Sequence, residues 1–255
     1  VYYVYAYLEL VRQGKRVLGE PMDVVVPTGN FGNILAAYYA RRMGLPIRKL
    51  VCASNANKVL TDFIRTGTYD RRREFHATAS PSMDILISSN LERLLYHLSG
   101  GNGEEIKGLM ENLDSQKSYE VSQKIKDGMA DFYGGYADVD TTNRTIGEMY
   151  ADHDYLMDTH TAVAYKVYED YKEATGDETP TIIASTASAY KFAESVAKSI
   201  GLGEEENGFR YVEALAAKTG VRVPKGLKDL ELREVRHTGV IDVDQMQATV
   251  ENCVE

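Results

Sequence analysis

The sequence predicts an α/β protein with a partly parallel sheet, helices on both faces of that sheet and a helical insert. Three observations support this fold class. Short apolar runs rich in β-branched residues, typical of buried parallel strands, occur at Met22–Val26, Lys49–Ala53 and Thr181–Ala184. Amphipathic segments with helical periodicity separate these runs. Between residues 22 and 53, a strand, a loop, a helix and a second strand follow one another, which is the order of a βαβ unit.

The first element is an amphipathic helix, because Val1, Val4, Leu8 and Val11 recur at helical spacing. No capping residue and no methionine precedes it. We therefore expect the native chain to extend upstream, with an N-terminal half that is absent from this sequence. Tyrosines cluster in the same helix, and we expect them to form a surface that packs on the missing half.

The segments between and after the strands predict further helices. In chain order we expect helices at Ile34–Met43, Val59–Ile64 and Leu86–Leu98, two polar helices within Glu104–Tyr133, helices at His160–Thr175 and Tyr190–Ser199, a short strand at Leu232–Val235 and a final helix from Asp242. Gly134-Gly135 is expected to close the polar pair, and Asp158 to cap the next helix. We therefore divide the chain into an α/β part at 1–103, a helical insert at 104–135 and the remainder of the α/β domain at 136–255.

The composition excludes several classes of function. With 255 residues, of which 44% are hydrophobic and 26% charged, the chain can bury a sizeable globular core. A net charge of -9 argues against a nucleic-acid binder, which needs cations to displace phosphate counterions. No apolar stretch is long enough to span a bilayer, so we expect no membrane partner. Cys52 and Cys253 lie far apart without paired Cys or His spacing, so we expect no disulfide framework, no metal site and a reducing cytoplasm.

The segment Gly29-Asn30-Phe31-Gly32-Asn33, between a buried strand and a helix, carries the clearest chemical signal. Glycine permits positive φ, so successive backbone N–H groups can turn toward one point. The free N–H groups of the following helix face the same point, and the helix dipole favours an anion there. The spacing is not that of a dinucleotide or triphosphate loop. The segment therefore predicts either a phosphate site or a tight turn in which Asn33 caps the helix.

A second group of hydroxyls, Ser185-Thr186-Ala187-Ser188, follows the strand at Thr181–Ala184. If that strand lies close to Met22–Val26 in the sheet, both loops face one cleft. A phosphate cradle and a neutral hydroxyl in one cleft suit a phosphorylated aromatic cofactor, with the hydroxyl bonded to its ring nitrogen. The alternative is that these residues only cap the next helix.

Two other groups of polar residues leave alternatives open. His160, at the start of a predicted helix, belongs either to a cofactor pocket or to helix capping and packing. Ser82 and Asp84 either line the substrate cleft or cap the helix expected near Leu86. The other histidines have no metal-ligand spacing and are assigned no role.

Six segments resemble threonine synthase, and they occur in the order of that family: Val26–Asn33, Ser54–Asn57, Ser80–Ile85, Ser88–Arg93, Asp158–Tyr165 and Ser185–Phe192. The glycine–asparagine loop is shared more widely among pyridoxal-phosphate (PLP) enzymes of the same fold. Ser80–Ile85 and Ser88–Arg93 are much more specific. The resemblance covers most of the chain up to about Phe192.

This resemblance implies the large domain of a fold type II PLP enzyme that converts O-phosphohomoserine and water to threonine and phosphate in threonine biosynthesis. The residues implied to hold the phosphate of pyridoxal 5'-phosphate are Gly29, Asn30, Phe31, Gly32 and Asn33. Thr186 is implied to meet the pyridine nitrogen, and a neutral hydroxyl there leaves the ring less protonated than an aspartate would.

The chain also departs from the family pattern. The family's Schiff-base lysine and its substrate-carboxylate loop are expected upstream, so no catalytic residue is assigned here. The lysines present are expected to lie on surface helices or turns, and Lys191, on the helix after Thr186, is expected not to face the cofactor aldehyde. Ala189 replaces a proline common in the family. We therefore expect a fragment that is inactive alone; the alternatives are a threonine-synthase-like phospholyase and a non-catalytic binding module that retains the phosphate loop.

Overall fold

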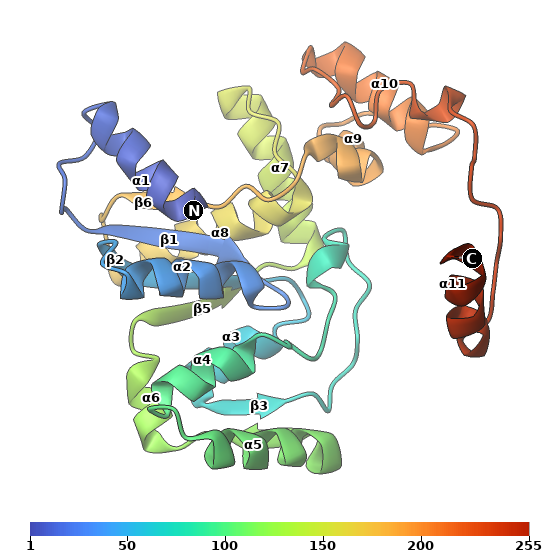
Figure 1. Cartoon of the computed structure of the whole chain (residues 1–255). Coiled ribbons are helices and arrows are strands. Elements are labelled where there is room, and N and C mark those ends of the chain that lie inside the picture. The colour runs from blue at the N-terminus through green and yellow to red at the C-terminus, as the bar shows by residue number, and fades with distance from the viewer. Residues whose placement is uncertain (255) are drawn as a thin grey trace. The chain divides into compact units, whose positions relative to one another are not determined.

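The computed structural model describes residues 1–254, and the chain divides into two compact units, one at 1–222 and one from residue 223 onward. The first unit is built on a sheet of four parallel strands in the order β5-β2-β1-β6 (Figure 1). The strands are β1 (Met22–Pro27), β2 (Ile47–Ser54), β5 (Phe132–Tyr136) and β6 (Thr181–Ile183). The α/β class with a parallel sheet is thus confirmed, and strand β6 lies directly beside β1.

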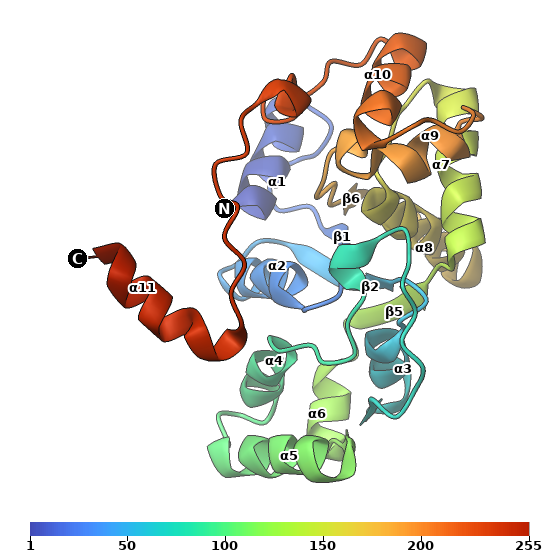
Figure 2. The same cartoon turned by 90° about the vertical axis from the view of Figure 1, so that its right-hand side faces the viewer.

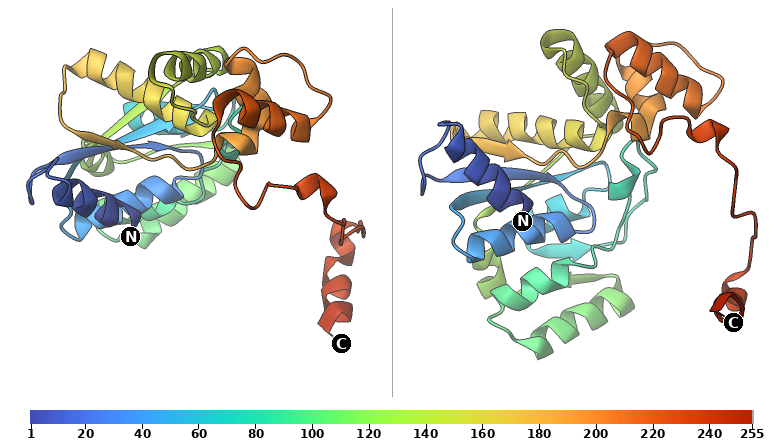
Figure 3. Two further views of the ribbon diagram at one scale, coloured as in Figure 1. Left: turned by 90° about the horizontal axis from the view of Figure 1, so that it is seen from above. Right: turned by 45° about the horizontal axis from the view of Figure 1, so that its top comes forward.

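Helices cover both faces of this sheet, as the sequence predicts. Successive side chains of a strand point to opposite faces. Val24 and Val26 therefore pack with α1 (Tyr2–Arg12) and α2 (Gly32–Arg42), whereas Val25 packs with α8 (Thr159–Thr175). Figure 3 shows α8 on one side of the sheet and the two N-terminal helices on the other. Strand β1 is buried along its whole length, so its carboxyl end is held at a defined place.

The region between residues 55 and 131 contains more than the predicted helices. It has α3 (Val59–Thr66), β3 (Thr68–Asp70), α4 (Leu91–Leu98), α5 (Gly103–Gln116), β4 (Ser118–Glu120) and α6 (Gln123–Gly128). Strands β3 and β4 form an antiparallel pair, in which the rings of Tyr69 and Tyr119 stack with centroids 5.2 Å apart. Such cross-strand aromatic pairs stabilise short ribbons. The helix expected from Leu86 begins only at Leu91, because residues 88–90 bond to a distant loop instead.

Gly134 and Gly135, expected to close the insert, lie instead inside β5 and pair with β2. Helices α3 and α8 approach this strand too closely for side chains at these two positions. A Cβ at Gly134 would lie 3.0 Å from the backbone of Thr61, and one at Gly135 would lie 2.5 Å from Cγ1 of Val167. The glycines therefore serve packing rather than a turn. The proposed boundaries at residues 103 and 135 stay predictions.

The remaining helices of the first unit are α7 (Val139–His153), α8, α9 (Ala193–Ser199) and α10 (Gly208–Thr219), and Figure 2 shows all four of them. The helix expected at Tyr190–Ser199 consists of a 3₁₀ turn, η2 (Ala189–Phe192), followed by α9. No helix of the described residues is long and apolar enough to cross a membrane.

The second unit contains η3 (Leu230–Leu232), η4 (Val243–Gln245) and α11 (Met246–Val254). The prediction of a final helix after Asp242 is confirmed. The strand expected at Leu232–Val235 was wrong, since Leu232 and Val235 are 84% and 75% exposed and have no partner strand among the described residues. A short segment without a pairing edge does not form a stable strand.

We expect Gly135→Ala to lower the free energy of unfolding by about 1–3 kcal/mol, because the added methyl group overpacks the contact between β5 and α8. Gly108→Ala is the matched control, since Gly108 lies in α5 with nothing near its Cβ position. Alanine there should stabilise the helix by up to about 1 kcal/mol. Urea unfolding followed by circular dichroism measures both. Equal midpoints for Gly135→Ala and the wild type would contradict the close packing of β5.

Candidate functional site

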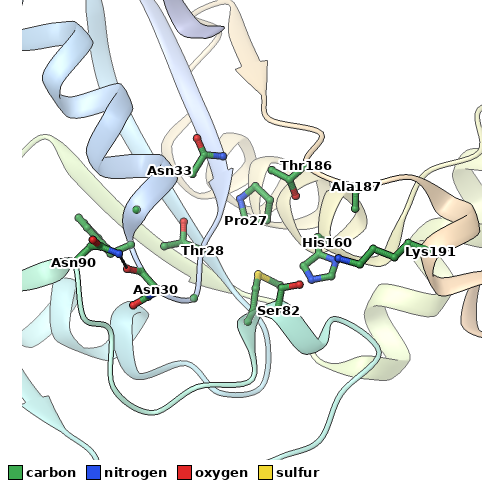
Figure 4. Close-up of a pocket in the computed structure, with 14 residues that line it drawn as sticks. Pro27, Thr28, Asn30, Asn33, Ser82, Asn90, His160, Thr186, Ala187 and Lys191 are labelled. Atoms are coloured by element: carbon green, nitrogen blue, oxygen red, sulfur yellow. Dashed lines mark hydrogen bonds between the residues drawn. The ribbon is translucent and has the colours of Figure 1, made fainter. Parts of the chain in front are cut away.

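The loops after β1 and β6 share one cavity at the carboxyl edge of the sheet. The cavity has a volume of about 410 Å³ (Figure 4). Its lining comprises Pro27, Thr28, Gly29, Asn30, Phe31, Gly32, Asn33, Ser82, Met83, Asn90, His160, Thr186, Ala187 and Lys191. All six residues predicted to bind a cofactor are in this set. The sheet brings them together because β1 and β6 are hydrogen-bonded neighbours that run in the same direction.

The backbone of the 29–33 loop offers a row of unused hydrogen-bond donors. None of the N–H groups from Gly29 to Asn33 has a hydrogen-bond partner among residues 1–254. Helix α2 begins at Gly32, so its positive dipole end lies at the same place. Donors of this kind bind anions, phosphate in particular. The loop can therefore hold a phosphate group without any side-chain cation.

The left-handed residue of this loop is Phe31, with φ 64°, and neither glycine has a positive φ. The sequence argument that placed positive φ at the glycines was therefore wrong. A bulky residue in this region costs about 1–3 kcal/mol, which the surrounding structure must offset. The Phe31 side chain is buried and its ring lies 6.0 Å from that of Phe132. Burial of the ring thus holds the strained turn.

The two glycines serve different purposes. A Cβ at Gly29 would lie 2.8 Å from Cα of Met83, so the turn at Pro81–Met83 could not approach the loop. A Cβ at Gly32 would meet only the Asn90 side chain, 3.3 Å away at Nδ2. Gly29 therefore permits packing, whereas Gly32 leaves the start of α2 open to a ligand.

A segment that the sequence analysis assigned no role, Ser88-Ser89-Asn90, holds the loop through its acceptor atoms. Asn30 Oδ1 accepts from both N and Oγ of Ser89 at 2.7 Å. Asn90 Nδ2 donates to the Asn30 carbonyl at 2.9 Å, and Ser88 Oγ donates to the Gly29 carbonyl at 2.9 Å. Carbonyl and amide oxygens of the loop are thus occupied, while its N–H groups remain available. The Ser88–Arg93 motif of the resemblance was the signal that could have found this role.

The alternative in which Asn33 caps α2 was wrong. The residue at the cap position is Phe31, which makes no side-chain capping bond. Asn33 lies inside the helix, and its Oδ1 accepts a hydrogen bond of 2.7 Å from the Tyr3 hydroxyl of α1. Asn33 therefore links the N-terminal helix to the site.

Ser82 takes one of the two roles left open for it, whereas Asp84 takes neither. Ser82 lines the cavity. Asp84 lies behind it and accepts from Asn55 Nδ2 at 2.7 Å, from Asn57 Nδ2 at 3.1 Å and from the Thr78 N–H at 2.8 Å. Asp84 thus stabilises the turn at Pro81–Met83, which packs against Gly29. Neither Ser82 nor Asp84 caps a helix, since α4 starts only at Leu91.

The three hydroxyl groups after β6 differ in their hydrogen-bond partners. Ser188 caps the 3₁₀ turn η2, with Oγ accepting from the Tyr190 N–H at 3.3 Å. Ser185 Oγ forms a hydrogen bond of 3.1 Å with Thr161 Oγ1. The Thr186 hydroxyl, by contrast, has no hydrogen-bond partner among the described residues and lines both this cavity and a neighbouring one beside α1. Capping therefore accounts for Ser188 and leaves Thr186 available to a ligand.

Asp158 and His160 form a buried pair at the start of α8. Asp158 caps the helix as predicted: Oδ1 accepts from the His160 N–H at 2.8 Å and the Thr161 N–H at 3.3 Å, and Oδ2 accepts from Thr161 Oγ1. Burial raises the pKa of Asp158, but the hydrogen bonds from His160 and Thr161 together outweigh it, so the pKa lies below its ordinary value. His160 Nδ1 is 3.3 Å from Asp158 Oδ1, whereas the buried Nε2 has no partner in the described structure.

Lys191 also lies at the site, and the expectation that it does not face the cofactor aldehyde stays a prediction. It belongs to η2 and lines the cavity. In Figure 4 its side chain extends toward the His160 ring. Convergence of these two residues depends on the packing of η2 against the start of α8, where the rings of Phe192 and His160 are 4.7 Å apart. No sequence spacing could have indicated it.

The fold and the site together define an α/β ligand-binding domain with an anion cradle at the carboxyl edge of a parallel sheet. Residues 161–252 match the family model described as threonine synthase, C-terminal. A curated relative from Macaca fascicularis, threonine synthase-like 1, is 44% identical over 206 residues, which cover 80% of this chain and 27% of that protein. Threonine synthase from Saccharomyces cerevisiae is 37% identical over 210 residues, or 76% of this chain and 40% of that protein.

Among solved structures, the PLP-bound threonine synthase from Brucella melitensis superposes with a TM-score of 0.82 and 32% identity, covering 98% of this chain and 49% of that one. The chain thus spans about half, or less, of the length of the proteins it matches. It belongs to the threonine synthase family and corresponds to a C-terminal portion of it.

We expect Asp158→Ala to lower the free energy of unfolding by about 1–2 kcal/mol at neutral pH, because α8 loses its cap. The folded pKa of Asp158 lies below the unfolded value of about 3.9, so its carboxylate stabilises the fold above that pH. The difference between wild type and variant should therefore shrink as the pH falls from about 4 through the lower folded pKa.

Urea unfolding at a series of pH values measures this difference, and Asp114→Ala, an exposed change in α5, is the control. A wild-type advantage that stayed constant or grew below about pH 4 would contradict the depressed pKa of Asp158.

Proposed function

We propose that this chain holds the phosphate group of pyridoxal 5'-phosphate on the N–H groups of Gly29, Asn30, Phe31, Gly32 and Asn33, as part of a threonine synthase. The activity proposed for the whole protein is the conversion of O-phosphohomoserine and water to threonine and phosphate, in threonine biosynthesis. The observation that carries the proposal is the row of unpartnered N–H groups at the start of α2, inside a cavity that also contains a free hydroxyl.

The residues present fit this cofactor. Five consecutive donors suit the oxygens of one phosphate group, and the absence of a side chain at Gly32 keeps the approach open. A cavity of about 410 Å³ is within the range of small-molecule sites. The name of the Brucella structure states that the threonine synthase was PLP-bound. These observations support PLP in preference to a cofactor without a phosphate group.

Each part of the chain has its own task in this proposal. When bound, the cofactor supplies an electron sink that stabilises negative charge next to the amino group of the substrate. The 29–33 loop anchors it, and residues 88–90 keep the loop in shape. Thr186 offers its hydroxyl to the pyridine nitrogen, which leaves that nitrogen less protonated than a carboxylate would. Ser82 and Met83 form the wall of the cavity beside Gly29.

The lysine that bonds the cofactor and the loop that binds the substrate carboxylate are proposed to come from a preceding half of the protein. The chain covers 49% of the Brucella threonine synthase, which leaves room for such a half. Covalent catalysis requires a lysine within bonding distance of the cofactor aldehyde. The chain alone should therefore bind the cofactor weakly and release no phosphate from the substrate. We also place the protein in the cytoplasm, since Cys52 and Cys253 are both unpaired.

A threonine-synthase-like phospholyase is the second candidate function. It is favoured by the relatives that are 44% identical, which are named threonine synthase-like 1 rather than threonine synthase. Such an enzyme would release phosphate without adding water at Cβ. Analysis of the products formed from O-phosphohomoserine by the full-length protein distinguishes the two: threonine and phosphate in equal amounts support the synthase, and phosphate without threonine supports the phospholyase.

Gly32→Val tests the proposed cofactor site directly. A side chain at Gly32 blocks approach to the N–H groups, and its Cβ meets only the Asn90 side chain, which needs to shift by a few tenths of an ångström, so the fold should survive. We expect the full-length variant to lose PLP on dialysis, as measured by absorbance and mass spectrometry. Gly103→Val, at the open start of α5, is the control and should retain the cofactor. Unchanged PLP affinity in a folded Gly32→Val protein would refute the assignment of the loop.

A further inference from the structure

Tyr69 is a buried tyrosine outside the cavity, and its hydroxyl bonds to the segment that precedes α4. Residues 84–90 of this segment form no helix or strand, so their backbone groups need partners elsewhere in the chain. The Tyr69 hydroxyl donates to the Leu86 carbonyl at 3.0 Å and accepts from the Ser88 N–H at 2.8 Å. One hydroxyl thus fixes two residues of the segment, since it acts as donor and as acceptor at once.

The ring of Tyr69 is held by the antiparallel pair of β3 and β4 and by α3. The ring is 1% exposed, stacks on Tyr119 with centroids 5.2 Å apart and meets the Phe63 ring edge-on at 5.7 Å. Burial raises the pKa of the Tyr69 hydroxyl to about 12, so the hydroxyl stays protonated and can donate at neutral pH. Contacts on two sides of the ring therefore give the hydroxyl a defined position.

Hydrogen bonds continue from this hydroxyl to the 29–33 loop. Ser88, whose N–H is bonded to Tyr69, donates from Oγ to the Gly29 carbonyl at 2.9 Å. The two residues that follow Ser88 bond to Asn30. Tyr69 is not among the residues that line the cavity. Its hydroxyl therefore reaches the loop only through the segment that precedes α4.

We propose that Tyr69 is a positioning residue, whose hydroxyl holds residues 88–90 where they keep the N–H groups of the 29–33 loop available to a ligand. That this ligand is the phosphate group of the cofactor rests on the function proposed above. Without the hydroxyl, the two backbone groups bonded to it lose their partner, and a buried N–H without a partner is costly. The segment must then shift, Ser88 releases the Gly29 carbonyl, and the loop is no longer held in its binding shape before the ligand enters.

The hydroxyl, and not only the ring, is therefore what the site needs from the β3 and β4 pair. The pair lies outside the four-stranded sheet, and none of its residues lines the cavity. A purely structural role would need two stacked rings but no hydroxyl. Tyr119 offers a direct comparison, because it shares the stack and its own hydroxyl has no hydrogen-bond partner among residues 1–254.

Tyr69→Phe removes the hydroxyl and keeps the ring, and Tyr119→Phe is the matched control in the same stack. In ligand-free ¹H–¹⁵N spectra of this chain, we expect Tyr69→Phe to shift the N–H resonances of Gly29 to Asn33 and Tyr119→Phe to leave them unchanged. In the full-length protein, Tyr69→Phe should weaken PLP affinity about tenfold, since one buried hydrogen bond is lost, and Tyr119→Phe should not.

Ser88→Ala separates a positioning role from a loss of packing, because it removes the Oγ bond to Gly29 and leaves the aromatic stack intact. If Tyr69 acts through Ser88, then Tyr69→Phe should weaken PLP affinity less in the Ser88→Ala background than in the wild type. Losses that add in full would contradict the proposal. Hydrogen exchange at the Ser88 N–H gives a test that needs no variant. We expect slow exchange in the wild type, and exchange as fast as in an unstructured peptide would overturn the bond to Tyr69.

Failure of the positioning role and failure of the proposed function have different signatures. The positioning role is refuted if ligand-free Tyr69→Phe and wild type have the same N–H resonances for residues 29–33. It is also refuted if PLP shifts these resonances in the wild type but binds folded Tyr69→Phe with equal affinity. If the proposed function fails instead, Tyr69→Phe still shifts the ligand-free resonances, while pyridoxal 5'-phosphate leaves those of the wild type unchanged.

Discussion

The hydrogen bonds from Ser88, Ser89 and Asn90 to the 29–33 loop are the interaction on which the site depends. They occupy the carbonyl groups of Gly29 and Asn30 and the side-chain oxygen of Asn30, and they leave the N–H groups unpaired. A loop whose donors and acceptors were paired internally would have nothing to offer a ligand. Because the acceptors are already bonded, the cradle exists before any anion enters, so binding need not reorganise the loop.

This arrangement places demands on the rest of the fold. The loop turns through a left-handed Phe31, whose strain is offset only while its ring stays buried against Phe132 in the edge strand β5. The turn at Pro81–Met83 must reach Gly29, and the Asp84 carboxylate holds that turn through four hydrogen bonds. On the other side, parallel pairing of β1 with β6 brings Thr186 to the same edge. The site thus depends on strands, turns and glycines distributed over most of the first unit.

Local sequence patterns predicted the parts of this fold that local forces determine. The strands β1, β2 and β6 could be predicted because β-branched runs mark buried parallel strands. The cap at Asp158 could be predicted because its side chain bonds to its own helix. Features that depend on contacts between residues distant in the sequence could not be predicted from local patterns. Strand β5 contains two glycines, which only the approach of α3 and α8 explains, and the late start of α4 reflects bonds to residues about sixty positions away. The six cofactor residues do share one cavity, but the arrival of Lys191 beside His160 follows from tertiary packing alone.

The central claim is that the backbone N–H groups of residues 29–33 bind the phosphate group of the cofactor. Amide ¹H–¹⁵N spectra of the chain, titrated in parallel with pyridoxal 5'-phosphate and with pyridoxal, measure this directly, because the two compounds differ only in the phosphate. The account predicts that the phosphorylated compound shifts the N–H resonances of Gly29 to Asn33 and that pyridoxal leaves them unchanged. N–H resonances of Gly29 to Asn33 that shift with neither compound, or that shift equally with both, would contradict this claim.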